Sequence, residues 1–171
     1  MQELNTTTLR GILAAILSVD EKYIVPKQGN WWNPQEADAN IENWCAYRIV
    51  SNTPRTAPFY VSRTENGQEI NSCVVTKIAT IELQFVGPSS ETLAQSVANW
   101  PLRADVNEQF KTVQGSIMLD DMNAISSIFS QDGNNTITAW NVRFDVLWES
   151  ITDTTQGLMI DLTLEGTIKR L

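Results

Sequence analysis

Two segments of this chain alternate between large apolar and polar residues, and this alternation constrains the fold more than any other feature. At 140–148 every even position carries a large apolar side chain. At 73–86 the odd positions are apolar except Lys77, whereas Glu82 and Gln84 lie among the even positions. Successive side chains of a strand point to opposite faces. Both segments are therefore predicted to be strands of an antiparallel sheet with one buried face and one wetter face.

Shorter apolar runs and turn residues complete the prediction for the sheet. Further strands are expected at 44–51, 59–62, 116–120 and 158–164. The strand at 158–164 is expected to pair with 140–148 as a hairpin, because the link between them is short. Turns are expected at Asn66-Gly67 and at 132–135, a proline-rich turn outside the sheet at 52–58, and a turn of helix or an irregular edge at 124–129.

Helical spacing appears elsewhere in the chain. Apolar residues repeat at intervals of three and four within 5–19, which Asn5 can cap, and two shorter helices are expected at 91–100 and 104–110. Residues 20–43 read as a loop-rich segment. The prediction is one α+β domain over residues 1–171, with a mainly antiparallel sheet of four or five strands and two or three helices packed on one face.

The composition excludes several classes of function. The 171 residues include no histidine, which rules out a Ser-His-Asp triad and the common zinc motifs. The net charge of −8 disfavours a nucleic-acid-binding domain. There is no signal-peptide pattern and no apolar run near the roughly 20 residues of a membrane span. Cys45 and Cys73 are expected to stay free thiols in a reducing cytoplasm.

No segment carries a convincing catalytic or ligand-binding motif. The carboxylates at Asp120-Asp121, Glu149 and Asp153 read as solvated loop acids. The stretch 87–90 lacks the glycines and lysine of a phosphate-binding loop and reads as a helix cap. We therefore expect no catalytic residue, cofactor or metal, and predict that the protein is not an enzyme.

The adjacent pair Trp31 and Trp32 lies in the polar loop and permits two interpretations. Both rings could pack as a lid over the core, as indole groups usually do. Alternatively, one ring could anchor a partner subunit, a common role of tryptophan at interfaces.

Positive charge gathers near the proline-rich loop, where Arg48, Arg55 and Arg63 fall close together beside Phe59 and Tyr60. The simpler interpretation is a solvated loop. The alternative is a local basic patch that meets an acidic neighbour, such as another copy of this acidic chain. With the tryptophan pair, these residues form the candidate subunit or partner interface.

The order and spacing of three segments resemble the tail terminator and neck proteins of tailed bacteriophages. The first is a strand that leads into a proline-bearing loop at 47–54. The second is a strand that ends in an aromatic residue and a glycine before a capped helix at 80–91, and the third is the Trp-centred strand at 140–146. The resemblance runs from about residue 40 to the C-terminus, and residues 120–135 do not align clearly with the group.

The resemblance implies a structural virion protein, made in the host bacterial cytoplasm, that forms a hexameric ring at the head-proximal end of the tail tube. Such a ring ends tube polymerisation and provides the head-tail joining surface. The implied partners are copies of itself, the tail tube protein, and sheath and neck connector proteins. An acidic lumen would let DNA pass without binding. Two alternatives stay open: another neck or connector component, and a non-viral α+β ligand-binding module.

Overall fold

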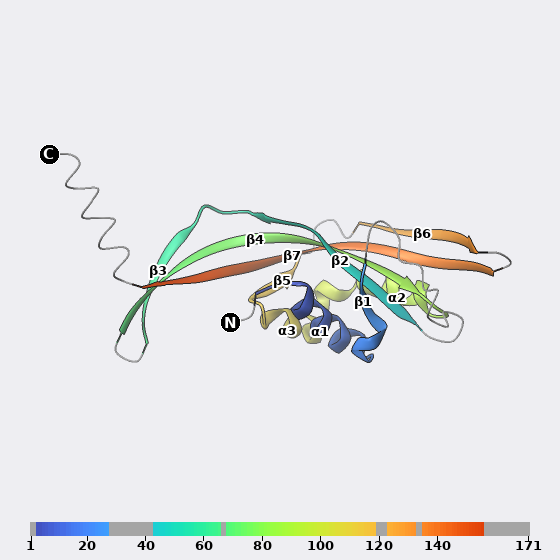
Figure 1. Cartoon of the computed structure of the whole chain (residues 1–171), viewed down its shortest axis with the longest axis horizontal. Helices are drawn as coiled ribbons and strands as arrows, with labels where there is room; N and C mark the ends of the chain where they lie inside the picture. Colours follow the sequence, from blue (N-terminus) through green and yellow to red (C-terminus); the bar gives the residue numbers. More distant parts are fainter. Residues whose placement is uncertain (1–2, 28–42, 66–67, 119–122, 133–134, 156–171) are drawn as a thin grey trace. The chain divides into compact units, whose positions relative to one another are not determined.

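The structure is a computed structural model that describes residues 3–27, 43–65, 68–118, 123–132 and 135–155 (Figure 1). The backbone falls into two compact units. The first contains residues 1–53 and 78–148, and the second contains residues 54–77 and the chain from residue 149 on. The single domain expected from the chain length stays a prediction.

Seven strands and three α-helices make up the described part of the chain. The helices are α1 (Thr6–Leu17), α2 (Ser90–Val97) and α3 (Ala104–Lys111), with short 3-10 turns at Glu21–Tyr23 and Trp100–Leu102. The strands are β1 (Ile24–Pro26), β2 (Trp44–Pro54), β3 (Phe59–Glu65), β4 (Gln68–Val86), β5 (Gly115–Ile117), β6 (Asn123–Asp132) and β7 (Asn135–Thr155).

The strands form one sheet in the order β1-β2-β4-β7-β5, with β3 added to β4 and β6 added to β7. The pairs β3–β4, β5–β7 and β6–β7 are antiparallel, and β1–β2 is parallel. β5 and β6 pair with successive parts of the long strand β7. The predicted α+β class with a mainly antiparallel sheet is confirmed.

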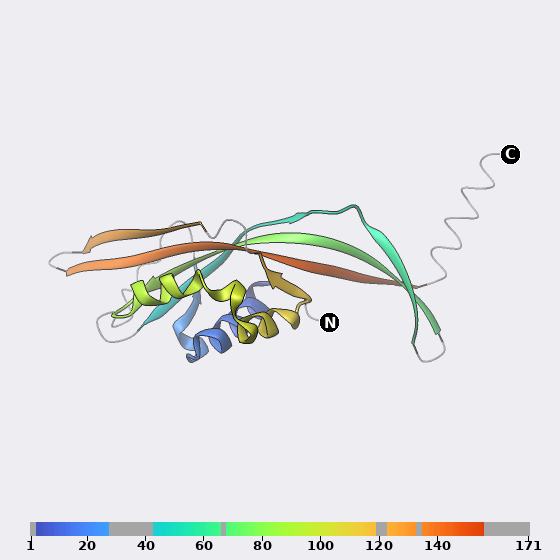
Figure 2. The same cartoon turned by 180° about the vertical axis from the view of Figure 1, so that it is seen from behind.

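All three helices lie on one face of the sheet of the first unit, as predicted (Figures 1 and 2). The apolar stripe of α1 is buried at Leu9, Ile12, Leu13 and Ile16, and the Asn5 side chain caps this helix. Each such side chain contributes about 1.5–3 kcal/mol when it is fully buried. A helix of this length would be marginal in isolation, so its packing against the sheet keeps it folded.

The centre of this core is aromatic. Phe144 of β7 makes an edge contact with Trp100, with ring centroids 5.6 Å apart, and another with Phe110 of α3 at 6.3 Å. The alternating apolar residues of β7 and β4 supply the sheet side of the core, at Val142, Phe144, Val146 and Trp148 and at Ala79, Ile81, Leu83 and Phe85. The alternation in the sequence therefore identified the face that the helices cover.

Several predicted elements differ from the observed ones. The predicted count of four or five strands was too low, because it omitted β1 and β6. β1 has only three residues and ends in Pro26, so it gives little signal. Residues 124–129 were expected to be a turn of helix or an irregular edge. They belong to β6, which pairs with β7, and the register of this pairing is irregular between Asn123 and Ser126.

Two further expectations concern strand ends. β2 continues to Pro54 instead of ending at Ser51, and its Asn52 side chain accepts a hydrogen bond of 3.1 Å from the Trp148 indole. The predicted Asn66-Gly67 turn and the predicted strand at 158–164 lie outside the described residues. Glu65 pairs with Gln68, so β3 and β4 form the two arms of a hairpin.

Candidate interaction surfaces

Strand β3 carries a group of exposed apolar residues in the second unit. Phe59 is 46% exposed, Tyr60 61% and Val61 45%. Successive residues of a strand face opposite sides, so Phe59 and Val61 share one face with Arg63, whereas Tyr60 lies on the other. We call Phe59, Tyr60, Val61 and Arg63 the β3 surface. Within the described residues β3 pairs only with β4, so its second edge is open.

Arg63 links the β3 surface to the end of β7. Its Nη2 donates to Oδ2 of Asp153 at 3.0 Å, and the Ser72 hydroxyl donates to Oδ1 of the same carboxylate at 2.7 Å. The two charged side chains are 42% and 52% exposed, so the ion pair is worth at most about 1 kcal/mol. Asp153, expected to be a solvated loop acid, is a strand residue that joins β7 to β3 and β4.

The predicted interface residues do not all lie in one unit. The second unit contains Phe59, Tyr60 and Arg63, and also Arg55, whose side chain is exposed beside Pro54. Arg48 belongs to the first unit, where it binds a buried carboxylate. Trp31 and Trp32 lie outside the described residues, and their predicted role stays a prediction.

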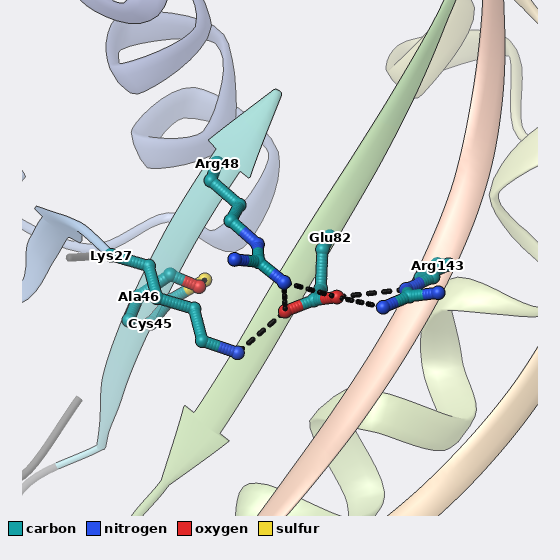
Figure 3. A network of polar contacts seen from close by, with 6 residues as sticks. All are labelled: Lys27, Cys45, Ala46, Arg48, Glu82 and Arg143. Atoms are coloured by element: carbon teal, nitrogen blue, oxygen red, sulfur yellow. Dashed lines mark hydrogen bonds and ion pairs between the residues drawn. The ribbon is translucent and has the colours of Figure 1, made fainter. Parts of the chain in front are cut away.

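That carboxylate, Glu82 of β4, is the centre of the second candidate surface (Figure 3). Ile81 and Leu83 point into the helix-covered core, so Glu82 between them points to the opposite face of the sheet. That face was predicted to be wet at Glu82 and Gln84. This prediction was wrong, because the two residues are only 2% and 0% exposed.

Three cations surround Glu82, each from a different strand or strand end (Figure 3). Lys27 follows β1, its N–H donates to the Tyr47 carbonyl, and its Nζ lies 2.5 Å from Glu82 Oε1. Arg48 of β2 places Nη2 3.1 Å from Oε1 and 3.2 Å from Oε2. Arg143 of β7 donates to Oε2 through Nε at 2.7 Å and Nη2 at 2.6 Å. We call Lys27, Arg48, Glu82 and Arg143 the Glu82 cluster.

The cluster sets the charge state of its carboxylate. Burial by itself raises the pKa of Glu82, but hydrogen bonds from Lys27, Arg143 and Arg48 more than offset it and lower the pKa from 4.5 to about 2. Glu82 is therefore ionised at neutral pH and is unsuited to donate a proton there. The cluster holds three positive charges and one negative charge.

Exposure is uneven within the cluster. The side chains of Lys27 and Glu82 are 1% and 3% exposed, that of Arg48 is 27% exposed and that of Arg143 is 55% exposed. Lys27, Glu82 and Arg143 were not among the residues predicted to form an interface. A signal was present, because a glutamate stands in the most apolar part of one strand and an arginine in the most apolar part of another.

The remaining reactive groups are dispersed. Cys45 and Cys73 are free, as expected, and burial raises the pKa of the Cys45 thiol. The described residues contain no group of three or more side chains placed to hold a metal ion. In the same part of the chain, no helix combines the length and the apolar character that a membrane crossing requires.

An α+β sheet with exposed apolar groups on an edge strand, and a charged cluster on the face opposite the helices, is typical of proteins that work by assembling with other proteins. Comparison with known families makes the class specific. Residues 5–168 match the family of phage neck terminator proteins, and the chain belongs to that family. The match begins well before residue 40, where the resemblance in the sequence began. No curated protein sequence matches the chain.

Membership gives the chain the role of a phage neck terminator. This role implies a place in the virion and assembly with other tail and neck proteins of the phage.

Proposed function

We propose that the protein forms a closed ring at the head-proximal end of the phage tail tube. There it ends tube polymerisation and provides the surface that joins the head. The observation that carries this proposal is the family match over residues 5–168. The proposed partners are further copies of the chain, with six the expected number, the tail tube protein, and sheath and neck connector proteins. Synthesis in the host bacterial cytoplasm and action without catalysis belong to the same proposal.

The β3 surface supports a ring. A closed ring uses heterologous contacts, in which each subunit presents two different patches. An edge strand with an open side and exposed apolar groups is suited to be one such patch, because its backbone groups can pair with a second strand and its apolar side chains leave water on contact. Tyr60, at 61% exposure, is its most exposed member.

The other predicted interface residues join this proposal in different ways. Arg55, beside the β3 surface, and Arg63, within it, would extend the contact with positive charge, and Trp31 and Trp32 would supply further aromatic anchors. Arg48 would contribute through the exposed 27% of its side chain, while its Nη2 stays bound to Glu82.

The net charge of −8 on each subunit would make a ring strongly acidic. We infer that its lumen repels the phosphate backbone, so that DNA passes without specific binding. Short duplex DNA should accordingly show no measurable binding to the ring in 50 mM salt, and tight binding there would contradict an acidic lumen.

The proposal can be tested on the full chain by native mass spectrometry and electron microscopy, alone and with tail tubes of the same phage. We expect a ring that caps one end of the tubes and stops their growth. Tyr60→Ser should reduce ring formation at least tenfold, equivalent to about 1.4 kcal/mol per subunit contact, and leave the thermal unfolding of the subunit unchanged.

Leu102→Ser is the matched control, because Leu102 is also an exposed apolar residue, at 76%, but lies in the first unit. This variant should assemble like the wild type. A wild-type protein that stays monomeric with tail tubes present and leaves their length unchanged would refute the proposed function. Equal assembly of the two variants would refute only the role of the β3 surface.

A further inference from the structure

The Glu82 cluster has more positive charge than its single carboxylate can neutralise. A carboxylate offers about four lone-pair sites. Glu82 receives Lys27 and Arg48 at Oε1, and Arg48 together with two donors of Arg143 at Oε2. Its acceptor sites are fully used, and the cluster keeps an excess of two positive charges.

Arg143 is the member through which this excess charge reaches the surface. Nε and Nη2 bind Glu82, which leaves Nη1 and its two N–H donors directed away from that carboxylate. The side chain is 55% exposed, the highest value in the cluster. Among the residues that the structure describes, Arg143 contacts one acid, Glu82.

The cost of burying a charge determines which partner can cover the Arg143 guanidinium. Enclosing a cation between protein surfaces is costly unless an anion comes with it. Arginine suits such a contact, because the N–H donors of its planar guanidinium match the two oxygens of a carboxylate. Copies of this chain are a ready source, because each has 20 acidic and only 12 basic residues.

We propose that Arg143 receives a carboxylate from a second copy of this chain, so that a ring contact is fixed by an ion pair built on Glu82. Glu82 orients the guanidinium from behind, and Lys27 and Arg48 hold Glu82 in place. The inference rests on the proposed ring, and it adds the chemistry of one contact within that ring.

The test compares full-length wild type with Arg143→Gln and Arg143→Lys by native mass spectrometry over a range of protein and salt concentrations. We expect Arg143→Gln to raise the protein concentration needed for half-assembly at least tenfold and to make assembly less sensitive to salt. Arg143→Lys should recover part of the loss. Lys111→Gln is the matched control, because Lys111 is an exposed cation on α3 that binds Glu108, and this variant should assemble like the wild type.

A second measurement needs no substitution. Phenylglyoxal modifies exposed guanidinium groups, and peptide mass spectrometry locates the product. Arg143 should react in the free subunit and be protected in the ring. Protection in the ring supports the proposal even if Arg143→Gln fails to fold, and equal reactivity in both states overturns it.

The outcomes separate this inference from the proposed function. If the wild type forms rings and Arg143→Gln forms them at the same concentration with the same salt dependence, the inference is wrong and the ring stands. If Arg143→Gln instead loses affinity for short duplex DNA and assembles normally, phosphate is the occupant and the inference is overturned. If the wild type forms no ring, both fail.

Discussion

Glu82→Gln tests whether the buried ion-pair cluster stabilises the fold. The amide keeps the size of the side chain but removes the charge that holds Lys27, Arg48 and Arg143. Lys27 is the critical partner, since its Nζ lies 2.5 Å from Glu82 and its side chain is 1% exposed. Removing one member of a buried ion pair costs about 3–5 kcal/mol, because the other charge stays buried without compensation. We expect a loss of that size in the free energy of unfolding.

Urea denaturation at neutral pH measures this loss. Glu108→Gln is the control, because the Glu108–Lys111 pair is 62% and 65% exposed and removing it should cost less than about 1 kcal/mol. A second comparison uses Arg143→Gln, which leaves Glu82 with two cations and removes a half-exposed charge. It should cost less than Glu82→Gln. If Glu82→Gln costs no more than Glu108→Gln, the buried cluster is not a source of stability and the reasoning fails.

The same cluster gives folding a dependence on acid. The pKa of Glu82 is about 2 in the folded chain against an ordinary 4.5, so the folded state holds its proton less tightly. The stabilisation is therefore fully present above pH 4.5 and is lost as the pH falls from 4.5 towards 2. Each pKa unit corresponds to about 1.4 kcal/mol, so the whole difference is about 3–4 kcal/mol. Glu82→Gln should show an acid-induced loss smaller by this amount, and an unchanged pH profile would contradict the assignment.

Three further predictions concern the core, the first helix and the thiols. Phe144→Ala should lower the free energy of unfolding by about 3–5 kcal/mol, because it empties the centre of the aromatic cluster. Leu102→Ala, at an exposed site, should change it by less than about 0.5 kcal/mol. Similar urea midpoints for the two variants would refute this account of the core. Asn5→Ala should lower the free energy of unfolding by about 1 kcal/mol, because the Asn5 side chain accepts a hydrogen bond from the Thr8 N–H at 2.9 Å. The start of α1 should fray, which faster amide hydrogen exchange would detect. Unchanged exchange would contradict this cap. In native protein a disulfide reagent should modify Cys73 and spare Cys45, because Cys45 is only 2% exposed and burial raises the pKa of its thiol. Rapid reaction of both would show that the sheet opens at β2.

The buried residues could be predicted from the sequence where apolar and polar residues alternate with the period of a strand or helix. The period of two in β4 and β7, and the stripe on α1, each identify the residues that enter the core. These patterns need no knowledge of partners, because the same face of a strand or helix stays buried along its length. Prediction failed for β1 and β6, whose strand character depends on pairing with β2 and β7. The seven predicted interface residues stay a prediction; they include Arg48 of the first unit and Arg63 of the second, which a local pattern cannot separate.

The sequence alone determined the α+β class, the helix-covered face of the sheet, the absence of histidine chemistry and the resemblance to phage neck proteins. It left Glu82 as an ordinary polar residue on a face expected to be wet. The burial of this carboxylate follows from the order of β1, β2, β4 and β7 in the sheet, because its partners Lys27 and Arg143 lie 55 and 61 positions away in the chain. Local patterns record which side chains avoid water, whereas strand order and register decide which charges meet.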